Sequence, residues 1–193
     1  MKRYIITTYT AGMPLNRDFY KSIQFYSFNK KARILIMQTT PADKTAYVES
    51  AILDYLIADE FKFNDSISAL PLDIPFTAVN PLSGFKRVGK RDKSVILPSN
   101  KMLLQTIPTN SAYPHVQMTT GSINRAQFDF ETSKKQSHIS LEDHACGAIV
   151  VEVDGDNFWF RQVEADYDGS FIDLGIRYCG KAKTAEKEIA EWL

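Results

Sequence analysis

A tight turn between two apolar runs constrains the fold more than any other feature of this sequence. Residues 148–153 (AIVVEV) and 158–163 (FWFRQV) are of strand length and rich in β-branched and aromatic side chains. Between them, residues 154–157 (DGDN) contain an Asp-Gly step, which accepts the positive φ of a tight reversal. The pattern therefore predicts an antiparallel hairpin, with the polar pair Asp143 and His144 at its entrance.

The N-terminal part alternates between strand and helix patterns. Residues 4–9 and 32–37 (ARILIM) predict strands, the second one covered on both faces. Between them, Asn16 can cap a helix whose apolar side chains share one face: Phe19, Ile23 and Tyr26. A second helix is predicted to start near Thr40 and to run through about Ala58.

The remaining runs predict a β-rich half. Residues 94–97, 102–107 and 116–120 are strand-length segments separated by Pro, Gly or Asn. The fold class expected is therefore α/β (α+β): an N-terminal strand-helix-strand-helix unit followed by a mostly antiparallel β-rich half. No composition change marks a boundary, so residues 1–193 are expected to form a single domain.

The charge balance and the cysteine spacing limit the partners and the cellular compartment to be expected. The 23 basic and 23 acidic side chains cancel, so no global field favours nucleic acid or a membrane surface. No apolar run approaches the ~20 residues that a membrane helix needs. Cys146 and Cys179 lack the spacing of a metal or redox pair, which favours a reducing cytoplasm.

One loop concentrates positive charge. Five cations lie within eight residues beside flexible glycines, a composition suited to contacting phosphates: Lys86, Arg87, Lys90, Arg91 and Lys93. The spacing of a Walker loop is absent. A solvated surface loop explains the same residues, so the pattern leaves both interpretations open.

Two further sets carry groups able to do chemistry. Asp143, His144 and Glu152, with His138 nearby, could build a metal or acid–base site, because carboxylates and imidazole bind hydrolytic metals. Capping, turn and ion-pair roles explain the same side chains. The run Thr119, Thr120 and Gly121 follows a predicted strand; it could offer hydroxyls to a ligand or simply end the strand.

Four segments together resemble a known family. Residues 80–109 (NPLSGFKRVGKRDKSVILPSNKMLLQTIPT), 114–123 (PHVQMTTGSI), 143–153 (DHACGAIVVEV) and 160–175 (FRQVEADYDGSFIDLG) are similar to the N-terminal region of bacteriophage metallophosphoesterase-like proteins, including the pre-early proteins with which some coliphages degrade host DNA.

The resemblance implies a longer protein in which a calcineurin-like phosphoesterase domain follows, opening with a G-D-x-H metal motif. This sequence contains no D-x-H, G-N-H-[DE] or G-H-x-H motif. The resemblance therefore implies no cofactor in this chain, and a divalent metal, Mn²⁺ or Mg²⁺, in the other domain.

On this resemblance the chain is an accessory domain that binds DNA or assembles subunits in the host cell cytoplasm. DNA, a homo-oligomer or another phage protein would be its partners, and a membrane would not. The family-motif positions carried over are Thr119, Thr120, Gly121, Asp143, His144, Gly147 and Glu152. Two alternatives remain: a self-contained metal-dependent hydrolase using Asp143, His144 and Glu152, and a non-catalytic protein-interaction module.

Overall fold

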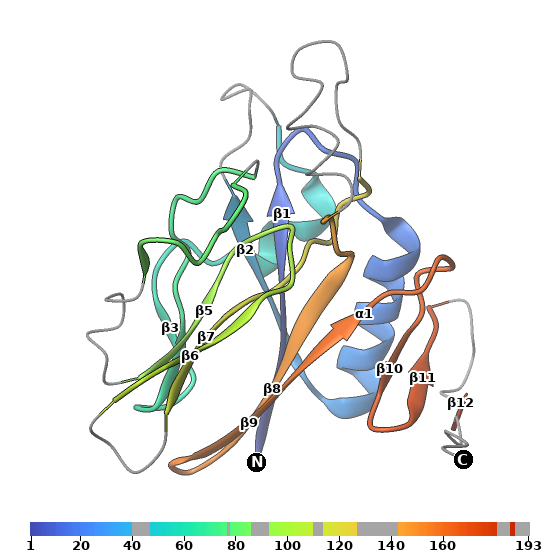
Figure 1. Cartoon of the computed structure of the whole chain (residues 1–193). Coiled ribbons are helices and arrows are strands. Elements are labelled where there is room, and N and C mark those ends of the chain that lie inside the picture. Colours follow the sequence, from blue (N-terminus) through green and yellow to red (C-terminus); the bar gives the residue numbers. More distant parts are fainter. Residues whose placement is uncertain are drawn as a thin grey trace, which may run out of the picture.

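A helix and two β-sheets form three layers in the computed structural model of the chain (Figure 1). The structure describes residues 1–39, 47–76, 78–85, 93–109, 114–126 and 143–180, together with the backbone of residues 186–187. The helix and the small hairpin of β10 (Phe171–Asp173) and β11 (Ile176–Tyr178) cover one face of the first sheet. The second sheet covers the other face.

The first sheet has the strand order β2-β1-β8-β9. Its strands are β1 (Lys2–Thr10), β2 (Arg33–Thr39), β8 (Gly147–Asp154) and β9 (Asn157–Glu164). β1 pairs in parallel with β2 and antiparallel with β8. The predicted hairpin is confirmed, because Asp154 pairs with Asn157 across a turn in which Gly155 has a φ of +59°.

The predicted helix α1 (Arg17–Lys30) is confirmed as well. The side chain of Asn16 caps it by accepting a hydrogen bond from the Phe19 amide at 3.2 Å. Phe19, Ile23 and Tyr26 are fully buried against the first sheet and the hairpin formed by β10 (Phe171–Asp173) and β11 (Ile176–Tyr178). A short strand, β12 (Glu186–Lys187), pairs with β11.

The second helix differs from the prediction. Residues 40–46 lie outside the described part of the chain, and the helical segment that follows is a short 3₁₀ helix, η1 (Ser50–Tyr55). It ends there because the next residues become extended along β2: Leu56 bridges Ile36, and the Ile57 amide donates to the Ile36 carbonyl at 2.9 Å. Pairing with the sheet edge thus overrides the helical stripe read from the sequence.

The second sheet has the order β3-β4-β5-β7-β6. Its strands are β3 (Phe61–Lys62), β4 (Ile67–Ala69), β5 (Ser94–Leu97), β6 (Leu104–Ile107) and β7 (His115–Thr119). The β4, β5 and β7 strands are parallel, whereas β3 and β6 flank them antiparallel. The β-rich second half is confirmed, and it contains this parallel centre within otherwise antiparallel pairings.

Two apolar cores hold the layers together. Ile5, Ile23 and Val150 belong to the core under α1, whereas Ile6, Ile96 and Val151 belong to the core between the sheets. Alternate residues of β1 and β8 therefore face opposite cores, as expected for central strands covered on both sides. No helix within the described ranges is both long and apolar enough to cross a bilayer.

Candidate functional site

Several predicted site residues meet at the carboxyl ends of β1 and β7. Residues 121–123 leave the second sheet and join the first, where Ser122 forms bridges to Thr8 on one side and Cys146 on the other. This segment brings the run Thr119 to Gly121 beside residues 143–147. In open α/β sheets, ligands bind in the crevice outside the carboxyl ends of the strands, so this end is the candidate site.

Hydroxyl groups at this end bond to one another. The Thr8 and Thr120 hydroxyls lie 2.6 Å apart, and the Ser99 amide donates to the Thr8 hydroxyl at 3.2 Å. The hydroxyls of Thr10 and Thr39, at the ends of β1 and β2, are 2.5 Å apart. All five side chains are buried, so these bonds satisfy groups that would otherwise be costly to remove from water.

Asn124 extends this network. Its side-chain carbonyl accepts from the Thr10 amide at 2.8 Å, and its side-chain amide donates to the Met13 carbonyl at 2.8 Å. Thr119 acts similarly in the second sheet: its hydroxyl donates to the Lys101 carbonyl at 2.7 Å and accepts from the Leu103 amide at 2.8 Å. These side chains therefore fasten the loops that follow the strands.

The two motif glycines allow backbones to approach closely. Gly121 has a φ of +72°, and a β-carbon there would lie 3.0 Å from both the Ala145 carbonyl oxygen and the Gly147 α-carbon. A β-carbon on Gly147 would collide with the sulfur of Met102. A side chain at position 121 would therefore press on the backbone of residues 145–147, whereas one at position 147 would require the Met102 side chain to move.

Asp143 pairs with a buried lysine. The Lys101 ammonium donates to Asp143 Oδ2 at 2.8 Å and to the Val79 carbonyl at 3.1 Å. The lysine side chain is 4% exposed, whereas the Asp143 side chain is 50% exposed. The carboxylate predicted to bind a metal thus neutralises a cation that the fold has buried.

His144 and Cys146 lie in the same segment. His144 Nε2 is 3.1 Å from the Asn124 carbonyl oxygen, and burial lowers the pKa of the imidazole. The neutral ring therefore donates from Nε2 to that carbonyl. Burial raises the pKa of the Cys146 thiol to about 12, although the Asn16 amide donates to its sulfur at 3.2 Å.

Glu152 lies in another part of the molecule. It is five positions beyond Gly147 on β8, about 16 Å along the strand. It accepts hydrogen bonds from Arg3 at 2.8 Å and from Arg161 at 3.2 Å. Burial tends to raise its pKa, but the hydrogen bonds from the two arginines hold the pKa below the usual value. The structure therefore does not bring Glu152 to Asp143 and His144.

The predicted basic loop is only partly described. Lys86, Arg87, Lys90 and Arg91 lie outside the described residues. Lys93 is described, and its ammonium forms an ion pair with Glu60 that lowers the pKa of the glutamate. The phosphate-binding role of this loop stays a prediction.

Residues 99–101 were missed by the sequence reasoning, although polar residues directly after the apolar run 94–97 are a recognisable signal. Asn100 is 2% exposed, and neither its amide nitrogen nor its side-chain oxygen has a hydrogen-bond partner among the described residues. Its backbone carbonyl accepts from the Ala145 amide at 2.9 Å. The side chain of Asn100 is thus a buried polar group whose hydrogen bonds no described residue supplies.

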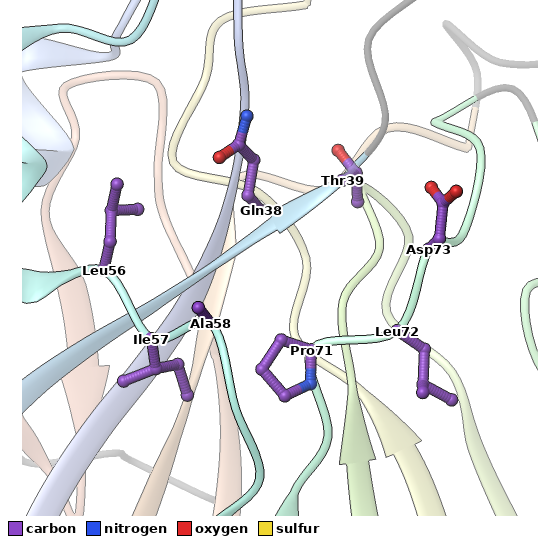
Figure 2. Close-up of a pocket in the computed structure, with 8 residues that line it drawn as sticks. All are labelled: Gln38, Thr39, Leu56, Ile57, Ala58, Pro71, Leu72 and Asp73. Atoms are coloured by element: carbon purple, nitrogen blue, oxygen red, sulfur yellow. The ribbon is translucent and has the colours of Figure 1, made fainter.

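A cavity of about 410 Å³ lies beside the end of β2 (Figure 2). Gln38 and Thr39 at the end of β2 line this cavity. Residues 56–58 line one side of it and residues 71–73 the other. Apolar side chains form most of the wall, and Asp73 supplies an exposed carboxylate at the rim. Its size is that of a small-molecule site, and one acidic group would favour a ligand that donates hydrogen bonds.

No protein-family model matches this sequence, and no curated protein matches it. Several solved structures are similar to this chain. Two of them are crystal structures of Vps29 from Chaetomium thermophilum, the second complexed with the RaPID-derived cyclic peptide RT-D3.

The first has 10% sequence identity and a TM-score of 0.48, and the alignment covers 93% of this chain and 100% of that chain. The second has 9% identity and a TM-score of 0.48, with 97% and 98% coverage. The likeness is coarse, and it assigns neither an activity nor a ligand to this chain.

Proposed function

We propose that this chain is a non-hydrolytic accessory domain of a phage DNA-processing phosphoesterase, and that it binds DNA. The observation that carries the non-hydrolytic part of the proposal is the hydrogen-bonded network at the carboxyl ends of β1 and β7. The side chains of Thr8, Thr10, Thr120 and Asn124 bond to each other or to backbone there, so they fasten loops instead of presenting reactive groups. The resemblance of four sequence segments to phage phosphoesterase-like proteins supports the same proposal.

The arrangement of the acidic residues does not fit a two-metal centre. Asp143 neutralises Lys101, His144 donates to a backbone carbonyl, and Glu152 lies farther along β8 between two arginines. Among the described residues, no three His, Cys, Asp or Glu side chains gather as metal ligands would. Hydrolysis with Mn²⁺ or Mg²⁺ therefore belongs to a separate domain in this proposal.

A cleavage assay tests the non-hydrolytic assignment. The purified chain is incubated with duplex DNA while Mn²⁺ and Mg²⁺ are titrated, and we expect no cleavage above the protein-free control. Metal-dependent cleavage by the wild type that disappears in the Asp143→Asn variant would refute the proposal and restore the hydrolase alternative.

DNA binding is proposed to use the basic loop. If all four residues contact phosphates, replacing them by alanine lowers the salt slope of duplex binding by about 3.6, because each lost contact contributes about 0.9. The substitutions are Lys86→Ala, Arg87→Ala, Lys90→Ala and Arg91→Ala. Unchanged binding at low salt would show that this loop does not hold DNA.

A second candidate function is assembly through β9. This strand is the edge of the first sheet, and Trp159 on it is 50% exposed. Exposed strand edges that carry large apolar side chains readily pair with another chain. Light scattering should then give a homo-oligomer for the wild type and a smaller species for Trp159→Ser. A monomer at every concentration would exclude this function.

A further inference from the structure

A second concentration of positive charge lies at the opposite end of the first sheet from the candidate site. The start of β1 and the turn from α1 to β2 enclose a surface cavity of about 460 Å³. It is lined by Met1, Lys2, Arg3, Tyr4, Lys30, Lys31 and Arg33, which we call the N-terminal basic pocket. Five of these seven side chains are cationic, in a chain whose charges cancel overall.

The pocket forms because two distant segments meet. Parallel pairing places Arg33 opposite Tyr4, and Lys31 takes the left-handed conformation, with a φ of 51°, that ends α1. The Lys31 amide donates to the Ser27 carbonyl, and the Ala32 amide donates to the same carbonyl at 3.0 Å. These two hydrogen bonds fix the C-terminal end of α1, so that its cationic residues lie beside the first strand.

Four of the five cations are in no ion pair among the described residues. Lys2, Lys30, Lys31 and Arg33 form no ion pair with any carboxylate of the described residues. The Arg33 guanidinium lies 5.1 Å from the Phe61 ring centre, and the Lys30 ammonium lies 5.9 Å from that of Tyr178. These aromatic rings hold the cations in place without neutralising them.

Arg3 is positioned differently. Its Nε donates to Glu152 at 2.8 Å and its Nη1 to the Lys30 carbonyl at 3.4 Å, so the guanidinium is fixed against the pocket floor. The second acid nearby, Asp154, lies 3.4 Å from the Met1 amine. Glu152 is shared with Arg161, which leaves the pocket with a clear excess of positive charge.

We propose that the N-terminal basic pocket binds the phosphodiester backbone of nucleic acid. Its volume is that of a small-ligand site, room for a phosphate with its attached sugar. Fixed, unpaired lysine and arginine side chains are the groups that contact phosphates and release counterions. This inference rests on the proposed DNA-binding function, but it uses different residues from the basic loop and does not depend on that loop.

The test compares two variants that each lose two positive charges. Lys2→Gln/Lys31→Gln changes two exposed pocket residues. Arg17→Gln/Lys21→Gln changes two exposed residues in the first half of α1, about 20 and about 14 Å along the helix from Lys30. Binding of a labelled DNA duplex is measured by fluorescence anisotropy between about 50 and 200 mM salt. The melting temperature of each variant verifies that it is folded.

The pocket variant should bind at least about tenfold more weakly at the lowest salt, with a salt slope reduced by about 1.8. The α1 variant should match the wild type. Equal loss in both variants would mean that charge acts diffusely, and no loss in either would mean that the pocket is not used; both outcomes overturn the inference. Sedimentation with phosphatidylserine vesicles, without DNA binding, would overturn it too.

The same titrations separate this inference from the proposed function. If the wild type binds DNA and only the alanine variant of the basic loop weakens, the pocket assignment fails and the proposed function stands. If the wild type does not bind DNA at any salt concentration, the proposed function itself fails.

Discussion

The Lys101–Asp143 ion pair predicts unequal effects of removing its two partners. The Lys101 side chain is almost completely buried, whereas the Asp143 side chain is half exposed. Asp143→Asn therefore leaves the Lys101 ammonium buried without an opposite charge. The Val79 carbonyl remains as its hydrogen-bond acceptor. Lys101→Met removes the buried charge itself, and the remaining carboxylate is hydrated where it stands.

The magnitudes follow from this asymmetry. Removing one partner of a fully buried pair costs about 3–5 kcal/mol, and the exposure of Asp143 lowers our expectation to about 2 kcal/mol for Asp143→Asn. Lys101→Met loses the ion pair, but it also removes the free-energy cost of taking the ammonium out of water. The two effects oppose each other, so we expect the free energy of unfolding to change by no more than about 1 kcal/mol. The double variant should resemble Lys101→Met, because no unpaired charge is left inside.

Urea unfolding measures these differences, and the melting temperature provides a second readout. A loss of about 2 kcal/mol corresponds to a decrease of about 4–8 °C for a chain of this size. If Lys101→Met destabilises the protein as much as Asp143→Asn does, the pair is not arranged as we argue. If Asp143→Asn leaves stability unchanged and abolishes a metal-dependent activity, Asp143 is catalytic.

Three further predictions concern the same region. Gly147→Ala should cost about 1–3 kcal/mol of unfolding free energy, and Met102→Ala added to it should recover part of that loss in a double-mutant cycle. Because burial lowers the pKa of His144, the stability it contributes is complete above about pH 6.5 and is lost as pH falls through the folded pKa. His144→Gln should thus flatten the unfolding free energy between about pH 7.5 and 5.5, and an unchanged slope would contradict this. With a pKa of about 12, Cys146 is about one part in ten thousand thiolate at pH 8, so iodoacetamide should label Cys179 first. Mass spectrometry that finds Cys146 labelled as fast would refute the burial argument.

Local sequence patterns predicted most helices, strands and turns. Pairing between distant segments determined the features that the patterns did not predict. The Asn16 cap, the α1 stripe and the 154–157 turn each depend on neighbouring residues, and all three are confirmed. The helix expected through residue 58 is a 3₁₀ turn instead, because its end pairs with β2, a contact that periodicity does not encode.

The candidate site was predictable in part for the same reason. Thr119 to Gly121 and the Asp143–His144 pair were recognised, and the structure brings them to one end of the sheets. Glu152 was grouped with them by sequence distance, but an extended strand carries it away. The N-terminal basic pocket was missed because its cations come from two segments that only the parallel pairing of β1 and β2 unites.

The central position of β1 has a consequence for how the protein is made. This first strand of the chain pairs with β8, and Arg3 contacts Glu152 across 149 residues of sequence. A nascent chain therefore carries β1 with one open edge until β8 has been synthesised. Folding dominated by such distant pairings is slow and exposes the intermediate to aggregation, so chains cut before β8 should collect in inclusion bodies.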